Sequence, residues 1–507
     1  MTTTFITRHP GAIEWTRSEN LLPENVAIAA TFDPETTQPG DLIIGTLPAQ
    51  ISARICERGG RYQHLSLDLP EHLRGKELSA DEMRACHARL EELYIQRSDV
   101  HAFAADEVRP NIHIVLATGE NLPNLIPTLH PSLKPSRVCI VATPLMLKDG
   151  VVNKLRHGLM VATKLPETSL PILQGCPEQN LTEIIAWANQ IALQLVQENK
   201  DSRLILNLTG GNKLMTVGFL QAFRTHAEII YCDTGHGHID FFHPIGKPRI
   251  KLQVNLLKLE PYLAVQGYKV RENHQDTKAL EARADLTRLL AENADKLERL
   301  VGKLNKAAYF YGEGKTDQAW VDFSNNPLEQ KIAEHMLKLG LLKKIGTQYQ
   351  VAHSTAESYL KGGWLEEWCW QVFKALEQGE DGKKIHPNRW GINQKIDHWD
   401  YLPIPGRDQF SLNELDAVLI HRNRMLLIEC KSGVQISERG ESQSILNKLE
   451  ALGKHVGGRL DTKWLLSARK IEGNSQAKQR ADKYKIKIIY PEQLKDLKKL
   501  TYLWLTA

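Results

Sequence analysis

The sequence predicts an α/β protein built from several domains. β-branched runs alternate with amphipathic helical stretches, which is typical of sheets covered by helices. The 507 residues are enough for three or four hydrophobic cores, and the hydrophobic fraction of 42% is ordinary for globular proteins. The residue composition and the pattern of apolar positions change along the chain. We therefore divide it into four units, residues 1–105, 106–275, 276–356 and 357–507.

Residues 1–105 are expected to form a small α/β domain. Short strands are predicted over residues 3–9, 41–47 and 61–69. A helix is predicted over residues 79–96, because Ser79 and Glu82 can form a capping box at its start.

Residues 106–275 are expected to form a Rossmann-like domain. Four strands are predicted, at residues 111–118, 136–143, 202–209 and 227–234, with a long helix over residues 181–199. This alternation predicts a mainly parallel, doubly wound sheet with helices on both faces.

Small and polar residues follow three of these strands. Ligands of doubly wound sheets bind beyond the carboxyl ends of the strands, so the three loops are expected to line one pocket. Glycines let backbone N–H groups approach a phosphate or ribose, and a helix start adds favourable partial charge. A nucleotide-like ligand is plausible, and a plain α/β turn is the alternative. The loop residues are Thr118, Gly119, Glu120, Asn121, Thr143, Thr209, Gly210, Gly211, Asn212 and Lys213.

Residues 276–356 are expected to be a helical and winged-helix-like linker. Leucines at helical spacing predict an amphipathic helix over residues 280–306. Residues 327–352 predict a helix, a glycine stop and a short hairpin, a pattern compatible with a winged helix. Such a module could bind DNA or serve as a structural connector.

Residues 357–507 contain a pattern of charges that suggests metal-dependent chemistry. Two strands, at residues 417–420 and 425–430, are joined by a turn, so Asp416 and Glu429 are expected to lie close together. Crowded carboxylates repel each other and usually persist because a divalent cation, here Mg²⁺ or Mn²⁺, neutralises them. Lys431 follows at the strand end, and helical spacing can place Glu366 over the same site. The alternative is a salt-bridged strand edge.

This order of a helical Glu, an Asp and a Glu-x-Lys resembles the PD-(D/E)xK nuclease superfamily. Leu415 stands where the superfamily motif has proline, which leaves the chemistry intact. The resemblance implies a restriction-endonuclease-like α/β domain in which Glu366, Asp416 and Glu429 bind the metal and Lys431 completes the catalytic set.

The strand, Thr-Gly-Gly-Asn-Lys and helix, followed by a linker and a Glu-Cys-Lys strand end, is similar to the CARF-containing effector nucleases of type III CRISPR systems. The likeness covers residues 108–507. It implies a homodimer whose CARF domains bind cyclic oligoadenylate, usually the tetramer, and thereby activate cutting of DNA or RNA. Residues Thr118, Thr143, Gly211, Asn212 and Lys213 are then ligand-binding candidates.

Residues 1–100 resemble a small stand-alone protein of type III CRISPR loci that is thought to degrade cyclic oligoadenylate. The likeness is carried by residues 7–15, 40–48 and 61–86. Cleaving a cyclic RNA needs a proton carrier, a cation and groups that hold the ribose and phosphate. The candidates for these tasks are Arg8, His9, Thr46, Ser66 and Asp68. Such a domain would limit the nuclease by destroying its activator.

Two other functions remain compatible with the sequence. One is a ligand-responsive transcription regulator that holds DNA through the winged-helix segment. In the other, residues 1–105 bind the activator or a partner protein without cutting anything.

Charge, cysteines and hydropathy restrict the class of protein further. The net charge of +4 is too small to prove a nucleic-acid partner. The seven cysteines include no C-x-x-C pair, so we expect reduced thiols. No stretch approaches the roughly 18 apolar residues of a membrane span, and no signal peptide is evident. We therefore expect a cytoplasmic protein without a membrane partner.

Overall fold

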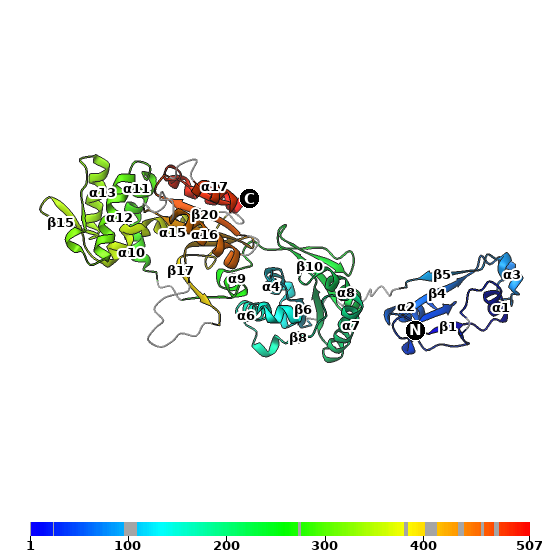
Figure 1. Ribbon diagram of the computed structural model, residues 1–507. Helices are drawn as coiled ribbons and strands as arrows, with labels where there is room; N and C mark the ends of the chain where they lie inside the picture. Colours follow the sequence, from blue (N-terminus) through cyan, green and yellow to red (C-terminus); the bar gives the residue numbers. More distant parts are fainter. Residues whose placement is uncertain are drawn as a thin grey trace. The chain divides into compact units, whose positions relative to one another are not determined.

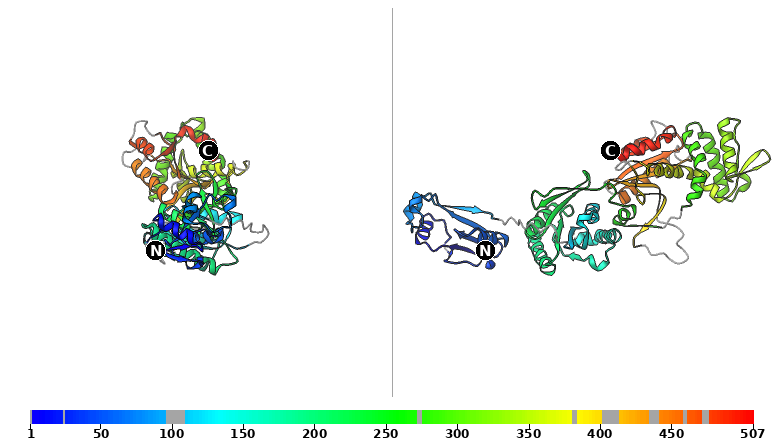
Figure 2. Two further views of the ribbon diagram at one scale, coloured as in Figure 1. Left: turned by 90° about the vertical axis from the view of Figure 1, so that its right-hand side faces the viewer. Right: turned by 180° about the vertical axis from the view of Figure 1, so that it is seen from behind.

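The computed structural model describes most of the chain and divides it into two compact units, Met1–Val108 and Arg109–Ala507 (Figures 1 and 2). The described residues are 2–23, 25–95, 109–271, 275–379, 384–400, 413–433, 441–457, 461–470 and 476–507.

The first unit contains a five-stranded sheet in the order β2-β1-β3-β4-β5. All neighbouring strands are parallel except β4 and β5. Helices α1 and α3 pack on one face of the sheet and α2 packs on the other. The elements are β1 (Thr3–Ile6), α1 (Pro10–Ser18), β2 (Ala27–Ala29), β3 (Leu42–Gly45), α2 (Ala49–Glu57), β4 (Arg61–Ser66), α3 (Ala80–Ala85) and β5 (Arg89–Leu93).

The helix predicted over residues 79–96 is wrong in its second half. It begins at the expected capping box of Ser79 and Glu82 but ends at Ala85. His87 then adopts a left-handed φ of 50°, which turns the chain back so that β5 pairs with β4.

The second unit begins with the seven-stranded sheet that the sequence predicts as doubly wound. Its order is β12-β11-β10-β9-β6-β7-β8, and the strands from β10 to β8 run parallel. One face packs against α4, α6 and α9, and the other packs against α7 and α8. The strands are β6 (Asn111–Leu116), β7 (Pro135–Ala142), β8 (Ile172–Gln174), β9 (Arg203–Asn207), β10 (Glu228–Asp233), β11 (His238–His243) and β12 (Ile250–Lys251). The helices are α4 (Leu122–Leu129), α5 (Pro144–Lys148), α6 (Val151–Thr163), α7 (Leu181–Glu198), α8 (Lys213–Phe223) and α9 (Leu259–Val265).

The linker is helical, but the single helix predicted over residues 280–306 is broken into three. The chain turns between Asn293 and Leu297, where backbone N–H groups of Lys296 and Leu297 bond to carbonyls three residues back. The predicted helix, glycine stop and hairpin are present, with Gly340 at a left-handed φ of 71°. The elements are α10 (Thr277–Ala282), α11 (Ala284–Glu292), α12 (Glu298–Gly312), β14 (Trp320–Val321), α13 (Pro327–Lys338), β15 (Leu342–Ile345), β16 (Gln348–Val351) and α14 (Ser354–Ser358).

The C-terminal part of the second unit contains a six-stranded sheet in the order β13-β17-β18-β19-β20-β21. One face packs on α15 and α18 and shares its core with the linker helices, which gather beside α15 in Figure 1. The other face packs on α16 and α17. The elements are β13 (Tyr268–Val270), α15 (Trp364–Leu376), β17 (Trp390–His398), β18 (Asn413–His421), β19 (Arg424–Lys431), α16 (Glu441–Leu452), β20 (Asp461–Ser467), α17 (Gln476–Lys483), β21 (Ile486–Ile489) and α18 (Leu497–Thr506).

All seven cysteines are free and buried. Within the described ranges, no helix combines the length and the hydropathy that crossing a membrane requires.

Candidate active site

A β-hairpin brings the predicted acidic residues together. Strands β18 and β19 are joined at Arg422 and Asn423, whose left-handed φ angles of 48° and 63° suit a tight hairpin turn. The antiparallel register pairs Ala417 with Ile428, so Asp416 and Glu429 occupy the next position along the two strands. The sequence alone therefore predicted that Asp416 and Glu429 lie close together, because the turn between the two strands determines how they pair.

The ammonium group of Lys431 lies between the two carboxylates. Its Nζ is 2.7 Å from Oε1 of Glu429 and 3.4 Å from Oδ2 of Asp416. The backbone N–H of Cys430 also donates to Oδ2 of Asp416, at 2.7 Å. Burial, reinforced by the charge of Glu429, raises the pKa of Asp416. Burial opposes the charge of Lys431, but Asp416 and Glu429 outweigh it and raise the pKa of the ammonium group.

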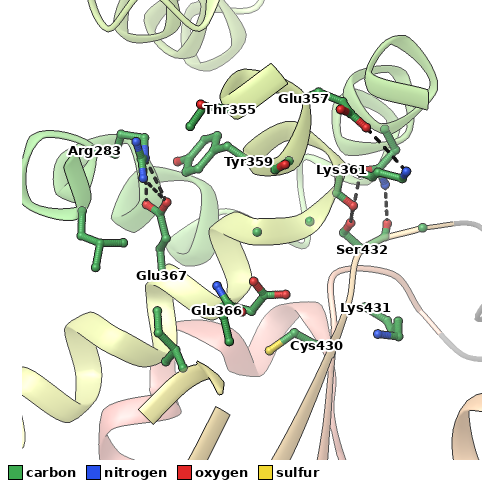
Figure 3. A pocket seen from close by; sticks show the side chains of 18 of the residues that line it. Arg283, Thr355, Glu357, Tyr359, Lys361, Glu366, Glu367, Cys430, Lys431 and Ser432 are labelled. Atoms are coloured by element: carbon green, nitrogen blue, oxygen red, sulfur yellow. Dashed lines mark hydrogen bonds and ion pairs between the residues drawn. The ribbon is translucent and has the colours of Figure 1, made fainter. Parts of the chain in front are cut away.

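Helix α15 contributes the third carboxylate, Glu366. A π-helical turn at Tyr359–Gly363 precedes the helix, and Gly362 in it has a φ of 144° that favours glycine. Burial, with the charge of Asp416 as the next cause, raises the pKa of Glu366 to about 8. Figure 3 shows Glu366 on the helix opposite the strand end that carries Cys430 and Lys431.

Glu366 and Lys431 line a cleft of about 1210 Å³. The opposite wall comes from the linker, through residues of α10, α12 and α14. The linker residues that line the cleft include Asp276, Ala279, Gly302, Asn305, Lys306, Tyr309 and Glu357.

The carboxylates suit a hard divalent cation in chemistry. Mg²⁺ and Mn²⁺ prefer carboxylate oxygens, and burial together with a neighbouring carboxylate charge raises the pKa values of Glu366 and Asp416. Among the residues that the structure describes, no three His, Cys, Asp or Glu side chains gather closely enough to hold a metal ion. In the present arrangement, Lys431 pairs with both Asp416 and Glu429, and Lys448 lies 3.8 Å from Glu429.

The predicted ligand-binding loops lie at one edge of the seven-stranded sheet. They follow the carboxyl ends of β6, β7 and β9, which are parallel neighbours. The side chain of Lys213 is exposed at the start of α8, and the hydroxyl of Thr143 accepts the N–H of Met146 at the start of α5. Gly119 is exposed, and a Cβ there would meet nothing within 4 Å. These residues leave room for a ligand at this edge.

Several loop residues form contacts within the protein that determine the conformation of the loops at this edge of the sheet. The hydroxyl of Thr209 donates to Asn207 and accepts the N–H of Cys232 at 2.7 Å. A Cβ on Gly210 would lie 1.9 Å from the carbonyl oxygen of Leu116, so this position requires glycine.

The other loop residues adopt a turn conformation, cap a helix or connect neighbouring segments through hydrogen bonds. Gly211 has a left-handed φ of 75°. Asn212 caps α8 through Met215 and also donates to the carbonyl of Glu178 at 2.8 Å. The side chain of Asn121 accepts the N–H of Thr118 at 3.3 Å.

The first unit has a pocket of about 770 Å³ that contains Arg8, His9 and Thr46. Nδ1 of His9 lies 2.9 Å from Oε2 of Glu77, and Lys76 also lines the pocket. These groups could supply a proton carrier and cationic charge.

Ser66 and Asp68, which were predicted to join these residues, lie elsewhere. Leu65 and Leu67 on the same segment point into the pocket, and the alternation of a strand sends Ser66 to the other side. Its hydroxyl donates to Glu91, and Asp68 forms an ion pair with Arg89 at 3.0 Å.

Sequence reasoning missed residues that reach the two pockets from distant segments. Glu77 contacts His9 across 68 residues, and Asn393 on β17 bonds to Glu366. Arg283 and Asn305 approach the cleft of Glu366 and Lys431 from the linker. No local motif marks these residues, although the helix-interior Asn305 is a residue type that usually favours caps.

Comparisons with known proteins match three stretches of the chain to models of protein families. The family model Cas_VVA1548, described as CRISPR-associated, matches residues 4–96. The model of the Card1 CARF domain matches residues 112–262, and the model of the Card1-like endonuclease domain matches residues 353–507. These matches confirm the resemblances stated from the sequence.

Two solved structures share the fold of the larger part of the chain. Can2 from Sulfobacillus thermosulfidooxidans, solved in complex with cyclic tetra-adenylate, has a TM-score of 0.59 and 22% identity and covers 78% of this chain and 100% of its own. Protein VC1899 from Vibrio cholerae has a TM-score of 0.63 and 19% identity and covers 78% of this chain and 98% of its own. No curated protein matches the chain in sequence.

Proposed function

We propose that this chain, which joins a Card1 CARF domain and a Card1-like endonuclease domain to a Cas_VVA1548 domain, is a nuclease of type III CRISPR defence that cyclic oligoadenylate activates. The observation that carries the proposal is a cleft lined by Glu366 and Lys431, whose ammonium group contacts Asp416 and Glu429. The substrate is DNA, RNA or both.

Glu366, Asp416 and Glu429 would hold Mg²⁺ or Mn²⁺ through their carboxylate oxygens in an active arrangement that brings the three side chains closer together than the described one does. When bound, such an ion lowers the pKa of a coordinated water and stabilises negative charge on a phosphate. Lys431 would orient the attacking water or a phosphate oxygen and stabilise the charge that develops during cleavage. The three acidic side chains come from two strands and a helix of one sheet-and-helix layer.

The activator would bind at the carboxyl edge of the seven-stranded sheet. Lys213 is exposed there for a phosphate, and the N-terminal N–H groups of the eleven-residue helix α8 favour an anion. The complex of Can2 with cyclic tetra-adenylate supports a cyclic oligonucleotide as the ligand class. Two copies of the chain would share one two-fold ligand, and activation requires that this ligand bind the active arrangement better than the idle one.

Cleavage assays with and without cyclic tetra-adenylate test this function. Labelled DNA and RNA are incubated with the full chain and Mn²⁺, and cutting should appear only with the activator. If no substrate is cut under any activator, the charged cluster is a strand-edge salt bridge. A ligand-responsive regulator that binds DNA through α13 and its hairpin then becomes the better assignment.

The affinity for Mn²⁺ is expected to rise with pH up to about pH 8. A carboxyl group must lose its proton before it binds a metal ion, and the pKa of Glu366 is raised to about 8. Below that pH the proton competes with the metal, so the apparent Kd should fall by up to about tenfold per pH unit. Titration calorimetry of the full chain between about pH 6 and 9 measures this slope. The Glu366→Gln variant should show a smaller slope, and an unchanged slope would contradict the assignment of Glu366.

The first unit would degrade the activator and so limit the response. The observation that favours this second activity is the pocket where His9 faces Glu77 beside Arg8, Lys76 and Thr46. His9 would transfer a proton, Arg8 and Lys76 would stabilise the phosphate, and Thr46 would help to hold the substrate.

Replacing His9 by alanine is expected to slow degradation of cyclic tetra-adenylate by about a hundredfold or more. The nuclease should consequently stay active for longer in the same reaction. His87→Ala is the matched control, because His87 is exposed and pairs with Asp68 outside the pocket. Chromatography of the activator over time gives the rate. Equal rates in the wild type and both variants would indicate that this unit binds the activator without cutting it, provided that the activator disappears no faster than in buffer.

A further inference from the structure

Ser432, which directly follows Lys431, connects the strand end to two other segments. It is buried, with 2% of its surface exposed. Its carbonyl oxygen accepts a hydrogen bond from Nδ2 of Asn305 at 2.8 Å, and its hydroxyl is shared between the carbonyl oxygen of Lys361 at 2.9 Å and Oδ1 of Asn305 at 3.1 Å. Figure 3 shows the contact between Ser432 and Lys361 beside Lys431.

Asn305 reaches Ser432 from the linker. It lies within α12, 127 residues before Ser432 in the sequence. Asparagine is a poor residue for the interior of a helix because its amide competes for backbone hydrogen bonds. Here Nδ2 and Oδ1 of Asn305 both form hydrogen bonds with Ser432, which explains why an asparagine occupies this helical position.

Gly362 brings the start of α15 against the same serine. A Cβ on Gly362 would lie 2.8 Å from Oγ of Ser432, so the close approach depends on glycine. Glu366 follows one turn later on α15. Ser432 therefore contacts both the linker and the segment that leads into the helix of Glu366.

The position of Lys431 depends on how its backbone is held. On one side, the N–H of Ala468 after β20 donates to the carbonyl of Lys431 at 3.0 Å. On the other side, Asn305 and Lys361 hold Ser432. Without Asn305, Ser432 would lose the two hydrogen bonds to that side chain and keep the one to Lys361, so Lys431 could leave the gap between Asp416 and Glu429.

We propose that Asn305 is a positioning residue that holds Lys431 in the nuclease site through Ser432. This inference rests on the proposed nuclease function and adds that the linker, outside the sheet that carries the acidic residues, supplies part of the site. An error in the position of a catalytic group of about 1 Å can cost about a hundredfold in rate, so the contact is expected to affect turnover strongly.

Single-turnover cleavage by the full chain tests the proposal. Asn305→Ala should lower the cleavage rate at saturating substrate by about ten- to a hundredfold and leave the KM for nucleic acid and the activator affinity nearly unchanged. In a Lys431→Ala background the same substitution should change the residual rate by less than about twofold, because a residue that acts through Lys431 has no further effect once that lysine is absent. Full additivity of the two effects would overturn the proposal.

Two further variants separate positioning from folding. Asn293→Ala removes another linker asparagine, whose side chain bonds to the carbonyl of Leu289 away from Ser432, so its cleavage rate should match that of the wild type. Asn305→Asp keeps the shape and the acceptor but loses the donor to Ser432, and it should show most of the effect of alanine if the protein stays folded. A fall in Tm without a fall in rate for Asn305→Ala would contradict the proposal.

Competitive acylation of lysines provides a measurement that does not depend on cutting. The ammonium of Lys431 is ion-paired with two carboxylates, and this pairing slows its acylation because the reagent reacts with the free amine. Mass spectrometry should find faster labelling of Lys431 in Asn305→Ala than in the wild type, with exposed Lys454 as the internal reference. Unchanged labelling would overturn the proposal even if the wild type cuts nucleic acid. If the wild type cuts nothing, the nuclease assignment fails while the labelling ratio still decides whether Asn305 positions Lys431.

Discussion

Replacing Lys431 by alanine is expected to lower the rate of activator-dependent cleavage by about a hundred- to a thousandfold. The ammonium group touches both Asp416 and Glu429 and lies at the mouth of the cleft, with 29% of its side chain exposed. It is therefore placed to contact a phosphate or water while it remains bound to the acidic pair. Removing it also takes away the ammonium group closest to these buried carboxylates and leaves Lys448, 3.8 Å from Glu429, as the remaining ion-pair partner of that residue in the described structure, which raises the cost of ionising the pair.

Two further variants, Glu429→Gln and Lys454→Ala, test whether the loss of cutting is specific to the residues of the proposed site. Glu429→Gln keeps the size of the side chain but removes one metal-binding charge, so it should lose cutting to a similar extent. Lys454 is an exposed lysine that pairs with Glu450, and its alanine variant should cut at the wild-type rate. Activator affinity, measured by titration, should be the same in all variants. A Lys431→Ala variant that cuts within about threefold of the wild-type rate would contradict the assigned role.

Local sequence predicted the acidic hairpin well because short-range geometry determines it. The turn at Arg422 and Asn423 aligns the two strands, and strand pairing then brings Asp416 beside Glu429. The seven-stranded sheet was predictable for the same reason, since β-branched runs and intervening helices are local signals. Parallel strands place their carboxyl-end loops at one edge whatever the packing of the remaining chain.

Two predicted helices were wrong where tertiary pairing decided the structure. Leucines at helical spacing run through residues 280–306, but the chain turns after Asn293 so that α11 and α12 can both bury their apolar sides in one core. Residues 89–93 have helical propensity, yet they complete the sheet as an antiparallel edge next to β4. Neither pairing leaves a signal in the local pattern.

The sequence predicts Glu366 at the acidic site but indicates no partner for the adjacent Glu367. The two glutamates are adjacent and both line the cleft. In the structure Glu366 is near Asp416 and Asn393, whereas Glu367 turns toward Arg283 in the linker. A partner that lies 84 residues away cannot be inferred from helical spacing alone.

Arg283 and Glu367 form a buried ion pair between the linker and α15. Nη2 and Nε of Arg283 donate to Oε1 of Glu367 at 2.6 and 2.9 Å. The side chains are only 14% and 8% exposed. Thr287 donates to the same carboxylate at 3.4 Å and bonds to the hydroxyl of Tyr359 at 2.9 Å, so the pair belongs to a buried network.

Glu367→Ala is expected to lower the free energy of unfolding by about 3–5 kcal/mol, because it leaves the guanidinium of Arg283 buried without its anion. An arginine stays charged at any ordinary pH, so it cannot reduce this cost by losing a proton. Lys374→Ala on the same helix removes only a pair whose lysine is 56% exposed, and the loss there should stay below about 1 kcal/mol. Calorimetric unfolding of the full chain compares the two variants.

Arg283→Ala should destabilise the protein less than Glu367→Ala does. The difference between the two variants should grow as the pH falls. Burial already raises the pKa of Glu367, although Arg283 opposes that shift. Without the guanidinium the carboxyl can take up a proton and become neutral, so the destabilisation is small below its new pKa and grows above it. A double variant with leucine at both positions should recover much of the loss, because no buried charge then remains unpaired. Equal, pH-independent losses in Arg283→Ala and Glu367→Ala would show that packing, rather than the charge left behind, accounts for the stability of this contact.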